Sequence, residues 1–128
     1  MVHKVTNDVN IVVETFYQPA QSKPIHSEYL FAYRITIENL GSVPVKLMRR
    51  HWHIIDSNGD VREVEGEGVV GQQPNIAPGE SYQYISSCNL SSDMGKMYGT
   101  YMMEDLFTKK MMQVGIPEFM LIAPFKNN

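Results

Sequence analysis

The sequence predicts an all-β protein in which about seven to eight strands form an antiparallel β-sandwich. Apolar side chains recur at every second position in several segments, which is the period of a half-buried strand. No segment sustains the period of about 3.6 residues that an amphipathic helix requires. Clusters of Gly, Pro and Asn separate the alternating segments, as expected for strands joined by turns.

The first two strands are predicted at 9–17 and 29–37. In the first, Val9, Ile11 and Val13 share one face. The intervening segment is polar and contains two prolines, so it is expected to be a loop. The second strand has the clearest alternation in the chain, and its large side chains are expected in the core; they are Tyr29, Phe31, Tyr33, Ile35 and Ile37.

A hairpin is predicted next, from a strand at 45–56 and a return strand at 61–65. Between them, Asn58-Gly59 favours a type I′ turn, because both residues tolerate the positive φ angles that this turn needs. Glycine-rich residues 66–74 then connect the hairpin to the rest of the chain. The remaining strands are predicted at 81–87, 97–104, 111–114 and 119–122, the last of them after Pro117.

The strand at 45–56 presents two different faces. Trp52 shares a parity with Met48, Arg50 and Ile54, and a Trp on a central strand of a sandwich is usually buried. The other parity carries Val45, Leu47, His51 and His53. An Arg on the core-facing parity must reach a carboxylate, a backbone carbonyl or the edge of the sandwich.

Composition limits the protein class. A chain of 128 residues with 43% hydrophobic residues fits a single soluble domain, expected over 1–128 with a core at about 9–122. A net charge of −3 disfavours nucleic-acid binding. Cys88 is the single cysteine, so no intrachain disulfide forms. Since no apolar run approaches a membrane span, we expect a cytoplasmic protein that does not bind a membrane.

Several motifs in one order resemble the ApaG family. They are R-H-W-x-I-x-D-x-N-G at 50–59, V-x-G-E-G-V-V-G-x-Q-P at 64–74, A-P-G-E-S-x-x-Y at 77–84, M-x-G-x-Y-x-M at 97–103 and V-x-I-P-x-F-x-L at 114–121. Together they extend over nearly the whole chain, which is more specific than any one motif alone. The chain is similar to the bacterial single-domain form of the family.

This resemblance implies an immunoglobulin-like sandwich of the fibronectin type III kind. It also implies an association with cobalt and magnesium efflux, a description that comes from phenotype rather than chemistry. The same domain is fused in eukaryotic F-box proteins and in a polymerase-delta-interacting protein, which suggests a protein-interaction module. No catalytic residues are established for the family, so the resemblance implies none here.

Two candidate sites lie in the central segment. Gly66, Glu67, Gly68 and Gly71 belong to a G-x-G-x-x-G string, which with Arg50 is a candidate site for a small anion, a nucleotide or pyrophosphate. No helix is predicted after the string, so a glycine-rich connection between strands is the favoured interpretation.

His51 and His53 have i, i+2 spacing on one strand face and form a candidate site for Zn²⁺, Co²⁺ or Ni²⁺. Asp56, Asp60 and Glu63 lie around the predicted hairpin, but Asp56 is on the opposite strand face and no third and fourth ligand is evident. A surface or packing pair is therefore the favoured interpretation.

The sequence therefore predicts a non-enzymatic binding module without a cofactor, acting on an unidentified protein partner and linked indirectly to cation efflux. The anion site and a direct metal sensor are the alternatives. A homodimer that forms through exposed sheet edges is a further alternative.

Overall fold

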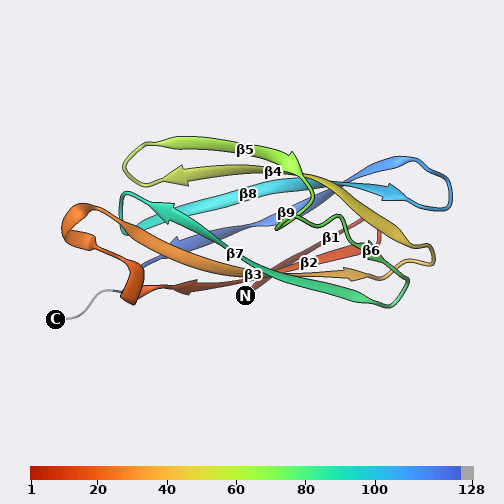
Figure 1. The fold of residues 1–128 in the computed structure, drawn as a ribbon, viewed down its shortest axis with the longest axis horizontal. Helices are drawn as coiled ribbons and strands as arrows, with labels where there is room; N and C mark the ends of the chain where they lie inside the picture. Colours follow the sequence, from red (N-terminus) through yellow and green to blue (C-terminus); the bar gives the residue numbers. More distant parts are fainter. Residues whose placement is uncertain (125–128) are drawn as a thin grey trace.

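The structure is a computed structural model that describes residues 1–124, and 125–128 of the expected domain lie outside the described residues. It is an all-β sandwich of two antiparallel sheets of the immunoglobulin-like, fibronectin type III-like kind, which confirms the predicted fold class (Figure 1). The strands are β1 (Val2–Thr6), β2 (Val9–Tyr17), β3 (Tyr29–Asn39), β4 (Val45–Asp56), β5 (Val61–Glu67), β6 (Asn75–Ile76), β7 (Ser81–Leu90), β8 (Met94–Asp105) and β9 (Met111–Ile122).

The loop between β2 and β3 contains two short 3-10 helices, η1 (Pro19–Gln21) and η2 (Pro24–His26). Within residues 1–124, neither of these helices, nor any other, has the length and apolar character to cross a membrane.

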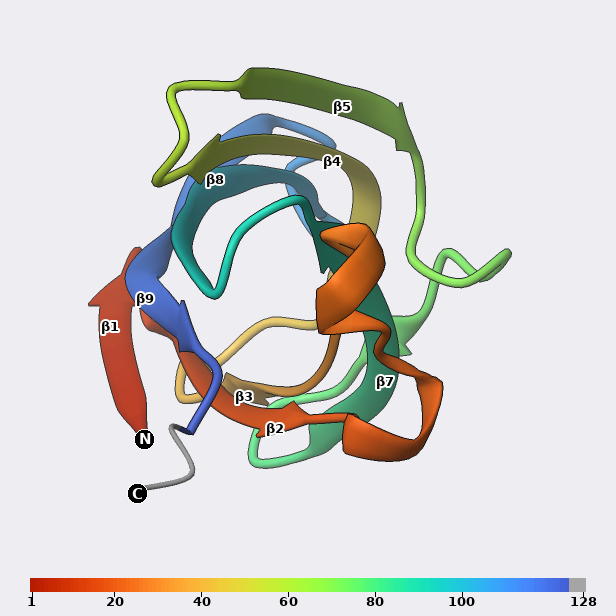
Figure 2. The same cartoon turned by 90° about the vertical axis from the view of Figure 1, so that its left-hand side faces the viewer.

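The two sheets have the strand orders β1-β2-β3-β7 and β5-β4-β8-β9, with β6 paired to the start of β4. One side of the sandwich is closed where β1 lies beside β9 (Figure 2). There Asn7 Nδ2 donates to Gln113 O, and the N–H of Gly115 donates to Thr6 Oγ1. On the opposite side the edge strands β5 and β7 face each other, which leaves this side open.

The core is built around Trp52, which is 3% exposed. Its ring meets those of Tyr33, Phe119 and Tyr101 edge-on, with centroids 5.6, 5.8 and 6.4 Å away. Aromatic rings prefer such arrangements because the positive ring edge meets the negative ring face. The prediction that Trp52 and the inward face of β3 are buried is confirmed for Phe31, Tyr33, Ile35 and Ile37.

A β-bulge in β4 corrects the predicted parity of that strand. The register with β8 shifts between Leu47 and Arg49, so Met48 is an extra residue. Leu47 and Trp52 were expected on opposite faces, but both are buried, because the extra residue moves the second half of the strand to the other parity. Arg50 keeps the core-facing parity together with Trp52.

The last two predicted strands form a single strand, β9, in the structure. β9 runs through Pro117, which was expected to separate them. Register pairs join Gly99 to Ile116 and Met97 to Phe119, so Pro117 lies in a bulge where the ladder is irregular. Proline has no N–H to donate, and a bulge is where a strand tolerates it.

The hairpin after β4 also differs from the prediction. Of the two expected turn residues, Gly59 has a positive φ of 101° and Asn58 does not, so the turn is not type I′. The N–H of Asp56 donates to Asp60 O, and that of Gly59 donates to Asp56 O. This is a three-residue loop, a type I turn followed by a glycine bulge. It pairs His53 with Glu63, whereas a two-residue loop would pair His53 with Val64.

β1 was not predicted from the sequence. A two-residue turn at Asn7 and Asp8, with φ angles of 50° and 62°, joins it to β2. Asn and Asp adopt such angles more readily than most residues, so this dipeptide was the available signal.

Asp56 is expected to make stability depend on acid pH. Asp56 is 6% exposed, and its carboxylate accepts hydrogen bonds from Ser92 Oγ and from the N–H groups of Ser91 and Asn58. Burial alone would raise the pKa of Asp56, but these hydrogen bonds outweigh it and hold the pKa below the ordinary value of 3.8. The contribution to stability is therefore complete above that value and is lost as pH falls through the lower folded-state pKa.

We expect Asp56→Asn to lower the free energy of unfolding by about 1–2 kcal/mol at neutral pH. The loss should shrink as pH falls below 3.8 towards the lower folded-state pKa, because the carboxylate is protonated first in the unfolded chain and then in the folded protein. Urea unfolding of both proteins across this range measures the difference, and comparison at each pH cancels other carboxylates such as Asp105. A difference that is constant with pH would contradict the assignment.

Candidate functional site

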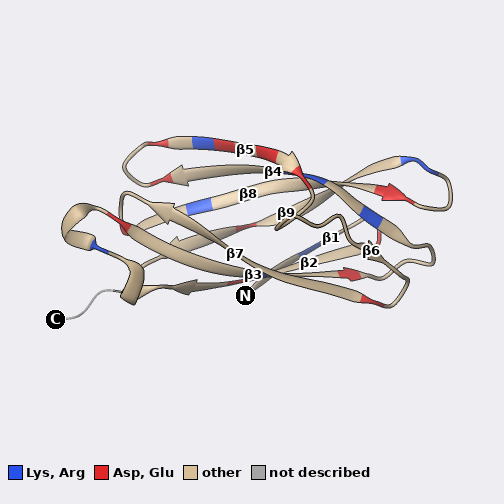
Figure 3. Cartoon of the chain, viewed as in Figure 1, with Lys and Arg blue, Asp and Glu red and all other residues tan. Residues whose placement is uncertain are grey.

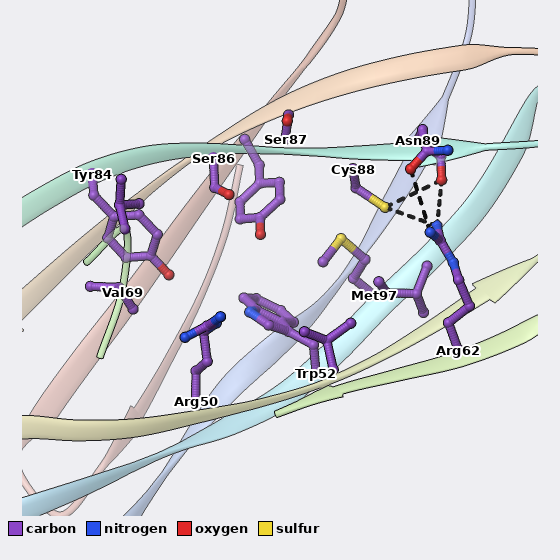
Figure 4. A pocket seen from close by; sticks show the side chains of 14 residues that line it. Arg50, Trp52, Arg62, Val69, Tyr84, Ser86, Ser87, Cys88, Asn89 and Met97 are labelled. Carbon is purple, nitrogen blue, oxygen red and sulfur yellow. Dashed lines mark hydrogen bonds between the residues drawn. The ribbon is translucent and has the colours of Figure 1, made fainter. Parts of the chain in front are cut away.

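The open side of the sandwich contains a cleft between β7 on one sheet and β4 and β5 on the other (Figure 4). Its volume is about 340 Å³, enough for a small ligand or for side chains of a bound segment. We call it the side cleft. It is lined by Tyr33, Arg50, Trp52, Ile54, Arg62, Val64, Val69, Val70, Tyr84, Ser86, Ser87, Cys88, Asn89 and Met97.

Arg50 brings a guanidinium to one end of the side cleft. Nη1 donates to the carbonyl oxygens of Glu67 and Gly68, at 2.9 and 3.0 Å. A Cβ on Gly66 would lie 2.8 Å from Nη1, so a glycine there leaves room for this side chain. The sequence-predicted residues Arg50, Gly66, Glu67 and Gly68 are thus brought together, through backbone carbonyls rather than through an ion pair with Glu67.

Arg62 brings a second guanidinium from β5 to the other end. Nη2 donates to Asn89 O, and Nη1 donates to Asn89 Oδ1 at 3.4 Å, so Arg62 bridges the open side from β5 to β7. Nη2 also lies 3.6 Å from Cys88 Sγ. Sequence reasoning did not single out Arg62, because its role depends on β7, which is distant in the chain.

Aromatic and neutral groups form the middle of the side cleft. Trp52 and Met97 lie between the two arginines (Figure 4), and Tyr33 also lines the cleft. The hydroxyls of Tyr84 and Tyr101 hydrogen-bond each other across the two sheets. Burial raises the pKa of Tyr33, Tyr84 and Cys88, in the last case despite the opposing charge of Arg62. These groups are therefore neutral at physiological pH.

Within the described residues, the lining of the side cleft carries two positive charges and no carboxylate, while Arg62 also borders an adjacent hollow that is lined by Asp56 and Asp60. Among residues 1–124, no carboxylate oxygen lies within 4.0 Å of the guanidinium of Arg50 or Arg62. No Asp, Glu or His is among the residues that line it. A negatively charged group would therefore complete the hydrogen bonding of two guanidiniums in a partly desolvated site.

In the glycine-rich string at 66–71 and the residue that follows it, backbone N–H groups are paired with carbonyls, whereas an anion site would need them free. The N–H groups of Gly68, Val69 and Gln72 donate to the carbonyls of Met48, Gln72 and Val69, respectively. These N–H groups are therefore already paired. The string turns back on itself through Val70 and Gly71, whose φ angles are 46° and 76°, and it leads into β6 rather than a helix.

His51 and His53 lie on the outer face of the sheet, away from the side cleft. Their ring centroids are 4.6 Å apart, and the ring of His53 stacks on Tyr98. The structure adds Glu63 as a third potential ligand, with Oε2 2.5 Å from His51 Nε2. Glu63 was expected near the hairpin but not as a ligand, because a two-residue turn would have placed it on the other face of the sheet.

Comparisons with known proteins agree on one family. The profile of the ApaG domain matches residues 19–105. A protein named Protein ApaG from Allorhizobium ampelinum is 45% identical over 124 residues, which is 97% of this chain and 95% of the relative. A protein of the same name from Dechloromonas aromatica is 48% identical, covering 93% of this chain and 94% of the relative.

A solved structure shows the same fold. The crystal structure of a Bordetella pertussis protein named ApaA superposes with a TM-score of 0.88 at 44% sequence identity. The match covers 91% of this chain and 94% of that protein.

Proposed function

Because the chain belongs to the ApaG domain family, we propose that it is a non-enzymatic binding module whose side cleft receives an extended acidic segment of a partner protein. The observation that carries the proposal is the pair of arginines, Arg50 and Arg62, at the two ends of an aromatic cleft without a carboxylate. The efflux association that the family resemblance implies then acts through this partner.

Charge complementarity favours an acidic occupant. Each guanidinium already donates to backbone carbonyls and has further N–H groups that can bind a carboxylate. Hydrogen bonds between guanidinium and carboxylate are stronger than those between neutral groups. Trp52 and Tyr33 line the side cleft as well, so an apolar side chain next to the acid would also find contacts.

The free strand edges favour a protein segment over a compact small molecule. β5 and β7 are the last strands of their sheets and flank the side cleft. Edge strands present unpaired backbone N–H and C=O groups, to which an extended segment can add as a further strand. Such a segment would combine backbone pairing with acidic side chains in the cleft.

The lining residues support a binding role rather than catalysis. A nucleophile needs a base or a lowered pKa, and burial raises the pKa of Cys88. Ser86 and Ser87 have no histidine or carboxylate beside them among the lining residues. His51 and His53 are on the outer face, where they cannot act as a base for this cleft.

The test is a selection of random linear peptides on the purified domain, followed by affinity measurement by fluorescence polarisation. We expect selected peptides to be rich in Asp and Glu and to bind at least about tenfold more weakly to Arg50→Gln or Arg62→Gln. Arg49→Gln is the matched control, because Arg49 is an exposed neighbour on the same strand that does not line the side cleft.

Selection of neutral or basic peptides, or equal binding to all variants, would contradict the proposal. Binding of citrate or pyrophosphate without binding of any peptide would instead favour the small-anion alternative. The same variants test the indirect efflux link: Arg62→Gln should fail to restore cobalt tolerance to a strain lacking the gene, whereas a His51→Ala, His53→Ala variant should restore it.

A further inference from the structure

We propose that His51, His53 and Glu63 form a binding site for a divalent transition-metal ion such as Zn²⁺ on the outer face of the β4–β5 hairpin. One potential ligand atom from each residue lies within 4.8 Å of the others. Imidazole nitrogens and carboxylate oxygens are ligands that Zn²⁺ and its neighbours in the first transition row accept. The site is separate from the side cleft and does not depend on the proposed function.

Strand pairing brings the ligands together. His51 and His53 are two residues apart on β4 and therefore share one face. In the β4–β5 register, Glu63 is directly opposite His53, and Glu65 is directly opposite His51. Cβ atoms of directly opposite residues lie about 4.5–5.5 Å apart, a spacing set by the sheet.

Neighbouring side chains orient the imidazoles before any ion binds. The ring of His53 stacks on Tyr98 of β8, with a centroid distance of 4.8 Å and an interplanar angle of 12°. The ring of His51 lies 4.6 Å from that of His53 and is held by its contact with Glu63. Orientation of this kind reduces the rotamer entropy that binding would otherwise cost.

Small movements of the three side chains would bring their ligand atoms to the spacing that a bound ion requires. A tetrahedral ion with bonds of about 2.0–2.1 Å holds its ligand atoms about 3.3–3.5 Å apart. His51 Nε2 and Glu63 Oε2 are 2.5 Å apart as a hydrogen-bonded pair, so the ion would replace that hydrogen bond and separate the two atoms. The side chains are 35% and 58% exposed, which leaves them room to adjust.

A fourth ligand and a favourable charge are close by. Glu65 Oε1 lies 3.6 Å from His51 Nε2, so Glu65 or a water can complete the coordination. Acidic residues predominate along β5 (Figure 3). Two carboxylates beside two neutral imidazoles would balance the charge of a divalent cation.

Calorimetric titration of the untagged protein with ZnCl₂ at neutral pH tests the site. We expect one ion per chain, with affinity reduced at least about tenfold in His51→Ala and in His53→Ala, and also reduced in Glu63→Gln. A His3→Ala, His26→Ala variant is the matched control and should bind as tightly as the wild type. A shift of the His51 and His53 ring proton resonances on addition of Zn²⁺ should accompany the heat.

Absence of stoichiometric Zn²⁺ binding to the wild type would overturn the proposal. So would binding that persists unchanged in His51→Ala and His53→Ala, because the ion would then be held elsewhere. Unchanged affinity in Glu63→Gln would overturn the three-residue site. Far-ultraviolet circular dichroism of each variant distinguishes a lost ligand from a lost fold.

Discussion

Trp52→Ala should lower the free energy of unfolding by about 3–5 kcal/mol, because it removes the central side chain of the core. The indole ring contacts Tyr33, Phe119 and Tyr101, and truncation would leave a cavity that rigid strands on both sheets cannot fill. The expected fall in Tm is about 10 °C or more. Urea and thermal unfolding followed by circular dichroism measure it, since the variant has no tryptophan left to fluoresce.

Trp52→Phe and Ile85→Ala are the controls for this prediction. Phenylalanine retains much of the apolar volume, so its cost should be clearly smaller than that of alanine. Ile85 is 60% exposed on β7, and its truncation should change stability by no more than about 0.5 kcal/mol. The prediction is contradicted if Trp52→Ala lowers the free energy of unfolding no more than Ile85→Ala does. The side chains that line the cleft would then have moved to fill the cavity left by the indole ring.

Burial of Trp52 could be predicted because alternation along one strand depends only on local sequence. The position of Leu47 relative to Trp52 could not, since the bulge at Met48 reflects how β4 pairs with β8. A one-residue change of register moves every later side chain to the other face. Local patterns therefore predict which segments are strands more reliably than they predict faces across an irregularity.

The same limit applies to both candidate sites. Arg50 could be singled out because an arginine on a core-facing parity needs partners, but Arg62 acquires its place only when β5 and β7 are brought to the same open side. His51 and His53 are visible as a pair in sequence. Glu63 joins them because the hairpin loop has three residues, not the two that Asn58-Gly59 suggested.

Asn39→Ala is expected to lower the free energy of unfolding by about 2–4 kcal/mol, because this buried side chain makes three hydrogen bonds to backbone groups. Asn39 is 2% exposed. Its Nδ2 donates to the carbonyls of Val43 and Ile76, both at 2.9 Å, and its Oδ1 accepts from the N–H of Gly41 at 2.9 Å. Alanine would leave these backbone groups without partners where water has little access, and urea unfolding measures the cost.

Asn39→Asp separates the loss of hydrogen bonds from a simple loss of volume. The carboxylate keeps the shape and the acceptor but cannot donate to the two carbonyls, and burial disfavours its charge. Relative to wild type at the same pH, the cost of this variant should therefore decrease as pH falls and the carboxyl becomes a neutral donor.

Asn10→Ala is the control, because Asn10 makes one side-chain hydrogen bond, to Glu38, and its Oδ1 has no partner within residues 1–124. Its cost should stay below about 1 kcal/mol. Equal costs for the Asn39→Ala and Asn10→Ala variants would contradict this prediction. Water would then replace the three hydrogen bonds of Asn39, and the buried amide would not be needed to join β3 to β6 and to the turn that follows β3.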